Sequence, residues 1–183
     1  MTTLQTSFSK NTFYFLLAGL LFLSSCSESP EKFFDITILN TNVLNDFASP
    51  TFASHINDET KEFPDIPSSK KNGNEAVTSI NNKVLYLEQS LEKIKKLSPT
   101  GDDEKAIKDQ AIQLYEMVIP VYKNEYTKYA QLCDAKGSDD DKKAAALQIE
   151  EKYAPAFEKR YTELLEKGKA YAAKHNIQVN WGQ

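Results

Sequence analysis

The sequence feature that most constrains the fold is a short turn at residues 136–138, which separates two long segments with helical spacing of apolar residues. Gly137 suits the left-handed position that follows a helix C-terminus. Ser138, with Asp141 three residues later, predicts the N-cap of the next helix. The turn therefore predicts a helical hairpin.

So short a turn forces the helices at 102–135 and 139–175 to lie antiparallel, and residues whose numbers add up to 275 then face each other. The apolar stripes of the two helices meet in this register, although the turn alone defines it. The facing pairs are Ala111 with Leu164, Leu114 with Tyr161, Val118 with Phe157, Val121 with Ala154, Tyr122 with Tyr153, and Tyr126 with Ile149.

A third helix is predicted over 75–97, where apolar residues alternate at spacings of three and four and Asn74 is the expected N-cap. The segment 102–135 opens with three acidic residues and carries two apolar stripes, which place it between two neighbours. The sequence thus predicts an all-α fold, an antiparallel three-helix bundle with helices at 75–97, 102–135 and 139–175.

Residues 26–73 are less regular and hold four of the seven prolines, which indicate loops. A free tether would lack large apolar residues, yet this segment contains five phenylalanines. We therefore expect it to dock in part on the helical domain at 74–183 and to supply a short fourth element. The alternation at 34–38 is typical of a strand, whereas the spacing of Ile38, Val43 and Phe47 also fits a helix. The prolines are Pro30, Pro50, Pro64 and Pro67, and the phenylalanines are Phe33, Phe34, Phe47, Phe52 and Phe63.

The first 25 residues have the properties of an export signal. Lys10 is their only charged side chain, and the apolar run from Phe13 to Leu23 is too short to span a bilayer but suits a signal peptide. The run leads into Leu-Ser-Ser-Cys at 23–26, a pattern similar to the bacterial lipobox. The similarity implies that residues 1–25 are removed and that Cys26 carries acyl chains such as palmitate. The alternative is an ordinary secretory signal followed by a chance cysteine.

The residue after the cysteine bears on the location. In proteobacterial lipoproteins an aspartate there is associated with retention at the inner membrane, and this chain has Ser27. The sequence therefore favours the outer membrane, held through the lipid anchor, and leaves open whether the protein faces the periplasm or the cell surface.

Composition and motifs exclude several function classes. With 22 basic and 26 acidic residues the net charge is −4, so no nucleic-acid partner is expected. Two cysteines and two histidines are too few for a disulfide scaffold or a multi-histidine metal site. The sequence has no G-x-S-x-G, H-E-x-x-H, P-loop, G-x-G-x-x-G or C-x-x-C-H motif. We therefore expect no catalytic residue, metal or cofactor, and a protein that is not an enzyme.

Seven of the nine tyrosines fall within 102–175. Half-buried core positions are the plainer interpretation of their helical spacing. The sharper hypothesis is a surface for a partner, because tyrosine is enriched in binding hot spots. Cys133 is expected in the core, His55 on the surface, and His175 at the end of the last helix, where a cation is favourable. The candidate partner face comprises Tyr122, Tyr126, Tyr129, Phe157 and Tyr161.

Two prolines, Pro120 and Pro155, lie inside predicted helices, where each removes a backbone N–H. Their numbers also add up to 275, so the hairpin register places them at one level. A shared bend there would keep the two helices packed and shape a concave face for a partner. The alternative is that one helix ends at its proline and restarts.

Three short patterns stand out in the helical part, namely Asn81-Asn82-Lys83-Val84, Tyr122-Lys123-Asn124-Glu125-Tyr126 and Lys169-Ala170-Tyr171-Ala172-Ala173-Lys174-His175-Asn176. Together they resemble a family of uncharacterised helical surface lipoproteins of Bacteroidetes and spirochaetes, over residues 76–179. The resemblance implies a helical fold and an envelope location, and it brings no established activity.

The sequence thus leads to one main functional expectation, a membrane-anchored envelope lipoprotein whose helical domain is a non-enzymatic binding module. The alternative is a small-ligand carrier or sensor with a pocket between helices. A hydrolase of envelope glycan or peptide is a third hypothesis, which would need a carboxylate or nucleophile with a perturbed pKa in a cleft.

Overall fold

The computed structural model describes residues 28–181, and these residues are helical with no β-strand. Cys26 and the expected signal peptide lie outside the described residues. The α-helices are α2 (Pro30–Thr37), α3 (Pro50–Asp58), α4 (Glu75–Lys96), α5 (Asp102–Val121), α6 (Thr127–Asp134) and α7 (Asp139–Lys174). Shorter elements are the 3₁₀ segments η2 (Leu39–Leu44) and η3 (Pro67–Ser69) and the π-helical segment η4 (Tyr122–Tyr126).

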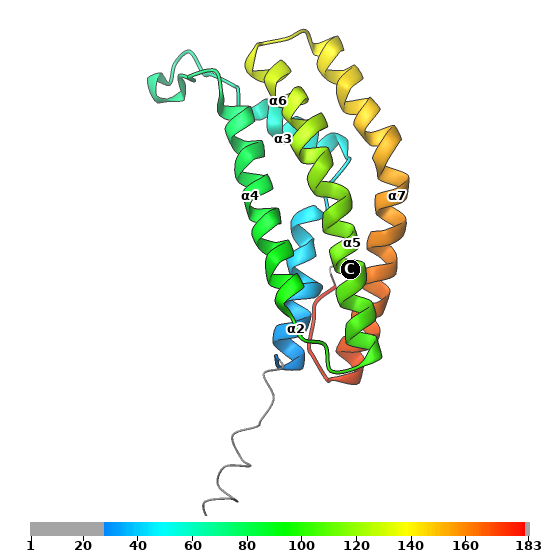
Figure 1. The fold of residues 1–183 in the computed structure, drawn as a ribbon. Helices are drawn as coiled ribbons and strands as arrows, with labels where there is room; N and C mark the ends of the chain where they lie inside the picture. Colours follow the sequence, from blue (N-terminus) through cyan, green and yellow to red (C-terminus); the bar gives the residue numbers. More distant parts are fainter. Residues whose placement is uncertain (1–27, 182–183) are drawn as a thin grey trace, which may run out of the picture.

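The all-α class is confirmed, but the structure has more helices than the predicted bundle of three. α4 and α7 match the predicted first and last helices to within one residue at each end. The predicted helix at 102–135 is divided into α5, η4 and α6, and the N-terminal segment adds α2 and α3. Figure 1 shows α4, the α5–α6 column and α7 running lengthwise, with α2 and α3 beside them.

Two of the prolines that indicated loops instead begin helices. Ser29 caps α2 and Ser49 caps α3, each accepting a hydrogen bond from a backbone N–H three residues later. Pro30 and Pro50 occupy the first helical position, where no backbone N–H is needed. Helix α2 also covers the stretch whose alternation was typical of a strand, so the strand interpretation is wrong.

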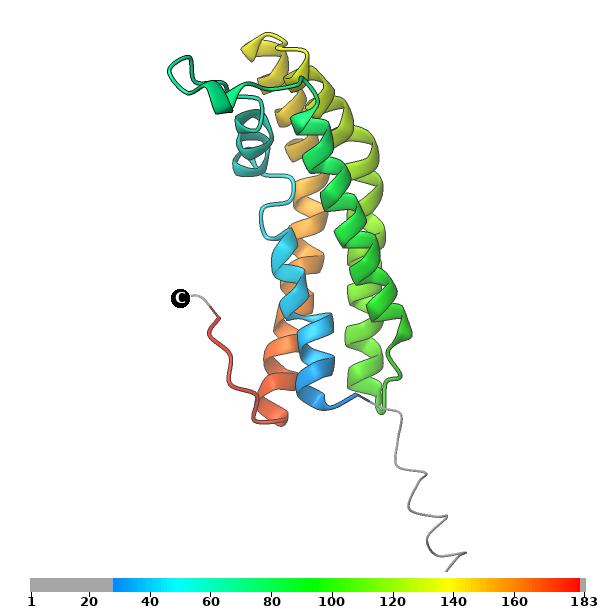
Figure 2. The same cartoon turned by 90° about the vertical axis from the view of Figure 1, so that its left-hand side faces the viewer.

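Residues 30–58 pack into the molecule. α2 and α3 both contact α4 and α7, and Figure 2 shows them beside α4 on the face turned to the viewer. The Ile38 side chain lies against Gly168 of α7, where a Cβ atom would fall within 2.9 Å of it. Phe63, in the loop before α4, is exposed. The buried large side chains of this segment are Phe33, Phe34, Ile38, Leu44, Phe47, Phe52 and Ile56.

The turn between α6 and α7 differs from the expectation by one residue. Lys136, with φ 54°, takes the left-handed conformation that was assigned to Gly137. The Gly137 N–H donates to the Leu132 carbonyl at 2.9 Å, as in a Schellman motif. Glycine is required there for space, because a Cβ atom would collide with the Leu132 side chain. Ser138 caps α7 as predicted and accepts a hydrogen bond from the Asp141 N–H.

Side-chain bonds between α5 and α7 follow the hairpin register. The Tyr171 hydroxyl donates to Glu104 Oε1 at 2.8 Å, and the numbers of these two residues add up to 275. The Arg160 guanidinium donates to Gln113 nearby in the same register. At the other end of the molecule, the Asp134 carboxylate accepts the first free backbone N–H groups of α4. Side-chain hydrogen bonds thus link α7 to α5 at one end of the helices and α6 to α4 at the other.

Across the described residues, no helix is long and apolar enough to cross a membrane.

Candidate functional site

The residues of the candidate partner face come together, but they do not form a surface. Tyr122, Tyr126, Tyr129 and Phe157 are buried, and Tyr161 is half-buried. The expectation that they are available to a partner is therefore wrong for this structure. The physical reason is that residues 38–57 of the same chain cover them.

Phenylalanine rings from the N-terminal segment pack against the tyrosines. The Phe47 ring centroid lies 4.8 Å from that of Phe157 and 5.5 Å from that of Tyr122. The Phe52 ring lies 4.7 Å from Tyr126 and 5.3 Å from Tyr122, in edge-on arrangements. These separations are the ones at which aromatic pairs attract each other. The candidate partner face, here called the tyrosine face, is thus covered by another segment of the same chain.

Tyrosine hydroxyls also hydrogen-bond to backbone groups of this segment. Tyr126 Oη accepts the Ala48 N–H at 2.9 Å, and Ala48 has a positive φ of 52°. Tyr129 donates to the Ala53 carbonyl at 3.0 Å, and Tyr115 donates to a carbonyl in η2 at 3.1 Å. Ala48 lies between η2 and α3, and a buried backbone N–H outside a helix needs such a partner. The tyrosines therefore hold the segment by its backbone.

A half-buried lysine adds a polar contact to the same interface. Lys83 Nζ, from α4, donates to the Val43 carbonyl at 2.6 Å and lies 3.9 Å from Asp46 Oδ1. Burial lowers the pKa of Lys83, and the neighbouring Asp46 charge opposes this shift. Burial raises the pKa of Tyr122 well above its usual range. The Tyr122 hydroxyl has no hydrogen-bond partner among the described residues.

The two prolines behave differently from each other. Pro120 stands in the last turn of α5, directly before the π-helical segment. The Asn124 side chain donates to the Pro120 carbonyl at 2.7 Å, and the Thr127 hydroxyl donates to the Tyr122 carbonyl at 3.0 Å. Pro155 lies inside α7, which continues through it. The interpretation that one helix ends at its proline therefore applies to Pro120 alone.

Both prolines are exposed, so they lie on the outer sides of their helices. Helices curve with the convex side toward solvent, and Figure 1 shows α7 bent along its length. The concave side therefore faces the interior, where Phe47 and Phe52 are buried. The shared bend at the two prolines stays a prediction, and on the inner side of these helices the chain itself supplies Phe47 and Phe52.

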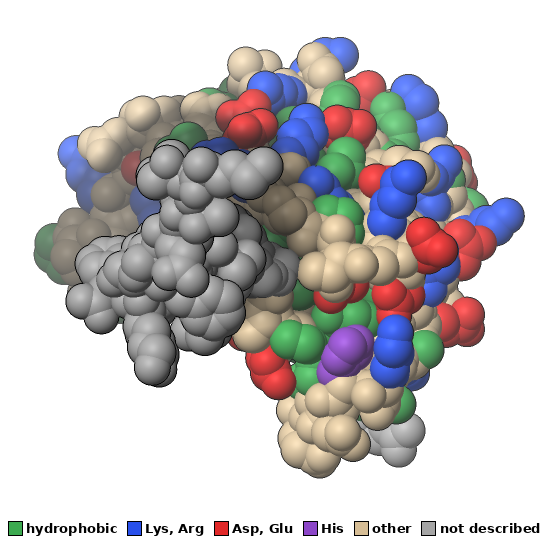
Figure 3. Space-filling model, turned by 60° about the horizontal axis from the view of Figure 1, so that its bottom comes forward, with side chains coloured by type: hydrophobic (Ala, Val, Ile, Leu, Met, Phe, Trp, Pro, Cys, Tyr) green, Lys and Arg blue, Asp and Glu red, His purple; other side chains and the backbone are tan. Residues whose placement is uncertain are grey.

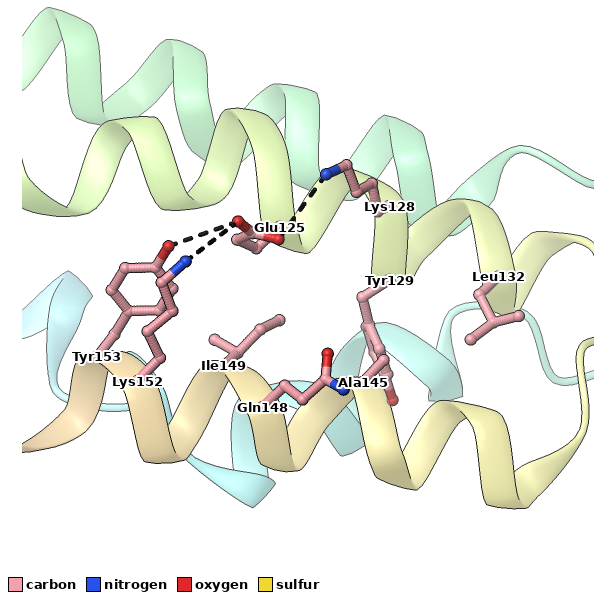
Figure 4. A pocket seen from close by; sticks show the side chains of 9 residues that line it. All are labelled: Glu125, Lys128, Tyr129, Leu132, Ala145, Gln148, Ile149, Lys152 and Tyr153. Carbon is pink, nitrogen blue, oxygen red and sulfur yellow. Dashed lines mark hydrogen bonds and ion pairs between the residues drawn. The ribbon is translucent and has the colours of Figure 1, made fainter.

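An open groove remains on the other side of α6, between α6 and α7. It has a volume of about 390 Å³. Figure 4 shows its side chains projecting from both helices and from the end of the π-helical segment. The floor carries apolar groups, including Ile149, which is buried. The lining residues are Glu125, Lys128, Tyr129, Leu132, Ala145, Gln148, Ile149, Lys152 and Tyr153.

One carboxylate lies between two ammonium groups at the rim of this groove. Glu125 is 3.9 Å from Lys152 Nζ and 4.0 Å from Lys128 Nζ, and the Tyr153 hydroxyl donates to it at 3.5 Å. The side chains of Lys128 and Lys152 are largely exposed. Contact with the Tyr153 hydroxyl raises the pKa of Lys152, and the Glu125 charge adds to this shift. Such long, solvated ion pairs are weak, so either lysine is free to bind an anion.

Of the groove residues, only Tyr129 belongs to the candidate partner face expected from the sequence. The others alternate charged, polar and apolar types at helical spacing, which is also the pattern of any solvated helix face. The available signal was Ala145, which the hairpin register places opposite Ala130. Ala145 lines the groove, whereas Ala130 is buried and does not.

The other residues considered from the sequence lie where they were expected. Cys133 is buried in the core, and burial raises the pKa of its thiol. His175 ends α7, with its ring centroid 4.2 Å from that of Tyr171, and His55 is exposed. Within residues 28–181, no group of three or more His, Cys, Asp or Glu side chains is placed to hold a metal ion.

No protein-family model, curated protein or solved structure matches this chain.

Proposed function

We propose that this protein is a bacterial envelope lipoprotein, anchored in the outer membrane by acyl chains on Cys26, and that it acts as a non-enzymatic binding module. The signal-like residues 1–25 and the lipobox similarity support the anchor. The groove between α6 and α7 supports the binding role.

The position of the groove fits this role. Only three residues separate Cys26 from Pro30, the first residue of α2, so the chain between them spans roughly 14 Å at most. An anchor at Cys26 would therefore hold the α2 end of the molecule close to the membrane. Lys or Arg and Asp or Glu side chains are interspersed at that end (Figure 3). α6 and the first half of α7, which line the groove, lie toward the opposite end (Figure 1), where a partner away from the membrane can reach them.

The single observation that carries the proposal is the pair Lys128 and Lys152 beside an apolar floor. Two exposed ammonium groups face one carboxylate, Glu125, so the rim has a net positive charge. The chemistry suits a ligand or side-chain cluster that joins an anionic group to an apolar part. Because the groove is open along one side (Figure 4), it favours a segment of a larger partner.

A second candidate function is a small-ligand carrier, because a volume of about 390 Å³ falls within the range of small-molecule sites. The two functions differ in what the groove retains. A carrier should release a bound small molecule when the purified protein is denatured, and mass spectrometry of the extract would detect it. A binding module should release none and should instead cross-link to a partner.

The test of the groove uses a photo-reactive amino acid at Gln148, which is exposed on the groove lining. We expect cross-linking in intact envelopes to one defined partner. The variant Lys128→Glu, Lys152→Glu should abolish this adduct. The matched control Lys143→Glu, Lys159→Glu changes two exposed lysines of α7 outside the lining and should retain it. An adduct that survives the groove variant would contradict the binding role.

The anchor is tested separately. Cells grown with a labelled fatty acid should show acylation of the protein, and Cys26→Ser should abolish the label and cause the precursor to accumulate. Equal membrane association of wild type and Cys26→Ser after a salt wash would overturn the lipoprotein proposal.

A further inference from the structure

The loop that leads into α4 contains a dipeptide, Asn72-Gly73, that occurs nowhere else in the chain. Each of the other asparagines is followed by a residue that carries a side chain. An asparagine side chain is an amide held close to the backbone nitrogen of the next residue, so the two groups can react without a second molecule. Glycine lacks the side chain that would hinder their approach. Asn72 is therefore the asparagine most open to reaction with its own backbone.

The structure places this pair in an exposed part of the molecule. Asn72, Gly73 and Asn74 are all exposed and lie between η3 and α4, outside any helix. Figures 1 and 2 show the segment between α3 and α4 standing out from the body formed by the long helices. Water therefore reaches both the side chain of Asn72 and the peptide bond that follows it.

The conformation at this pair leaves room for the reaction. Gly73 has a φ of 88°, in the left-handed region that glycine tolerates. No atom lies within 4 Å of the position that a Cβ atom would occupy there. Asn72 hydrogen-bonds through its backbone N–H, and its side-chain amide makes no hydrogen bond within residues 28–181. This amide is therefore free to turn toward the Gly73 nitrogen.

One carboxylate, that of Glu75, holds three consecutive N–H groups of the loop. It accepts hydrogen bonds from the N–H groups of Asn72 at 2.7 Å, Gly73 at 3.1 Å and Asn74 at 3.2 Å. The bond from Asn72 is the main reason that the pKa of Glu75 is lowered. All three bonds are exposed to solvent, and hydrogen bonds of this kind open at a low cost in free energy. The loop is thus ordered and still able to reach the geometry of attack.

We propose that Asn72 is a site of self-modification, at which the protein converts its own asparagine to aspartate and isoaspartate. The Gly73 backbone nitrogen attacks Cγ of Asn72, so that a new N–Cγ bond forms and the Cγ–Nδ2 bond breaks. The Gly73 nitrogen loses its proton, and the departing amino group gains a proton and leaves as ammonia. A cyclic succinimide remains in the chain.

Water then opens the ring at either of its two carbonyl groups. Addition at Cγ breaks the new bond and gives aspartate with a normal backbone. Addition at the main-chain carbonyl breaks the original peptide bond and gives isoaspartate, in which the chain continues through Cγ. In sum the protein takes up water and releases ammonia, with no oxidant, reductant or cofactor. The reaction requires neither the lipid anchor nor a partner in the groove.

The isoaspartate product would disturb the start of α4. Its backbone contains an additional methylene group between Cα of residue 72 and the Gly73 nitrogen, so the three N–H groups can no longer reach the Glu75 carboxylate with their present spacing. Both products also place a new negative charge near Glu75, and like charges repel each other. The next two N–H groups, at the start of α4, are held by Asp134 instead. We therefore expect the disturbance to stay local.

The experiment follows the full-length protein by peptide mass spectrometry as it ages at neutral pH. The peptide that contains Asn72 should gain the mass that corresponds to replacement of an amino group by a hydroxyl group, and fragmentation should show both aspartate and isoaspartate. Asn81 and Asn82, which are exposed within α4, are internal controls and should stay unchanged over the same period. A helical backbone hinders ring closure at these two positions.

Two variants test the chemistry. Asn72→Gln keeps Gly73 and its φ but would have to close a larger and less favourable ring, so it should abolish the modification. Gly73→Ala should slow it about tenfold, equivalent to about 1.4 kcal/mol in the barrier. An Asn72 that reacts no faster than Asn81 and Asn82 would overturn the proposal, as would equal rates in wild type and Gly73→Ala.

Hydrogen exchange measures the structural consequence in the same samples. In aged wild type, the N–H groups of residues 73–75 should exchange faster than in Asn72→Gln of equal age, while the temperature of thermal unfolding should hardly change. Isoaspartate at residue 72 with unchanged exchange would overturn the consequence proposed for the start of α4. A large loss of thermal stability would likewise show that the disturbance is not local.

Discussion

Helix α6 has one side that the chain itself covers and one side that it leaves open. On the covered side, the tyrosine face holds residues 38–57 through ring contacts and hydrogen bonds to backbone groups. On the open side, α6 and α7 diverge into a groove with lysines at its rim. Tyr129 belongs to both, because its ring lines the groove while its hydroxyl donates to the Ala53 carbonyl.

The comparison shows that a cluster of aromatic residues does not by itself mark the surface that is available to a partner. Phe47, Phe52 and the tyrosines stabilise the covered side because burying aromatic rings is favourable, and every hydroxyl that finds a backbone partner avoids a desolvation penalty. The groove stays open because Lys128 and Lys152 would lose their hydration if an apolar segment covered them. A partner with its own charge can bind there at a lower cost.

The largest expected effect is a loss of folding stability in alkaline solution, and it comes from the buried tyrosines on the covered side. Burial raises the pKa of Tyr115, Tyr126 and Tyr129, as it does that of Tyr122. Their contribution to stability is complete below the unfolded-state pKa of about 10 and is lost as the pH rises toward their folded pKa values. At about pH 11 each such group removes up to about 1.4 kcal/mol, so together they should remove several.

Lys83 acts in the opposite direction, because a lowered folded pKa makes stability rise as the pH increases up to about 10.5. The gain in stability from Lys83 alone is smaller than the combined loss from the four tyrosines. Urea unfolding of the Cys26→Ser form at about pH 8, 9.5 and 11 would measure the net effect. Stability that is unchanged up to the highest pH would show that the tyrosines are not buried as described.

Phe47→Ala should be the most damaging single substitution on the covered side. Its ring contacts Tyr122, Tyr126 and Phe157, and removing a buried phenylalanine costs about 3–5 kcal/mol. The control is Phe63→Ala, because Phe63 is exposed and its loss should change the free energy of unfolding by no more than about 0.5 kcal/mol. Equal effects of the two changes would mean that residues 38–57 are not docked.

Gly168→Ala tests the contact of α7 with the start of the same segment. In an open helix this change stabilises by about 1 kcal/mol. Here the new methyl group would lie 2.9 Å from Ile38 Cγ2, and overpacking costs about 1–3 kcal/mol, so we expect a net loss. In an Ile38→Ala background the sign should reverse. A thermal-unfolding double-mutant cycle measures this coupling, and additivity of the two changes would contradict it.

Tyr126→Phe and Tyr122→Phe compare two neighbouring hydroxyls. Tyr126→Phe leaves the buried Ala48 N–H without its partner and should cost about 1–3 kcal/mol. Tyr122→Phe removes a buried hydroxyl that has no partner among the described residues, so stability should stay unchanged or rise slightly. The same ordering should appear in hydrogen exchange at Ala48. An equal loss in both variants would indicate that the hydroxyls act only by packing.

The smallest effect is expected in the groove. Lys128→Ala and Lys152→Ala each remove an exposed ion pair with Glu125, worth at most about 1 kcal/mol. Unfolding should barely change, while the cross-link from Gln148 should weaken. A large loss of stability would assign the groove to the packing of α6 on α7 instead of to binding.

The outer ends of the three predicted helical segments agree with the structure to within a residue, whereas α2, α3 and the division of α5 from α6 were not predicted as such. Apolar periodicity located α4, and the Ser138 cap and the hairpin register located α7 and its contacts with α5. These features depend on residues close in the sequence or on a short turn, so local rules suffice. The break after Pro120 was predictable as an alternative, but its form as a π-helical segment followed by an immediate restart was not.

The groove and the covered face depended on where the N-terminal segment goes. Its prolines pointed to loops, and only the helix caps at Ser29 and Ser49 could have indicated otherwise. Once docked, this segment turns the tyrosine face into core and leaves charged residues to line the remaining groove. Periodicity along one helix cannot reveal this, because it shows that a stripe is apolar and does not show what covers it.

By itself, then, the amino-acid sequence determined the all-helical class, the hairpin register and the positions that must be buried, since these follow from local propensity and the spacing of apolar residues. Only the tertiary structure decided which apolar stripe is satisfied within the chain and which surface is left for others. The physical reason is that burial is a property of pairs of surfaces. Phe47 packs on Phe157 of α7 and Phe52 on Tyr126 of η4, and no element among the described residues covers the groove between α6 and α7.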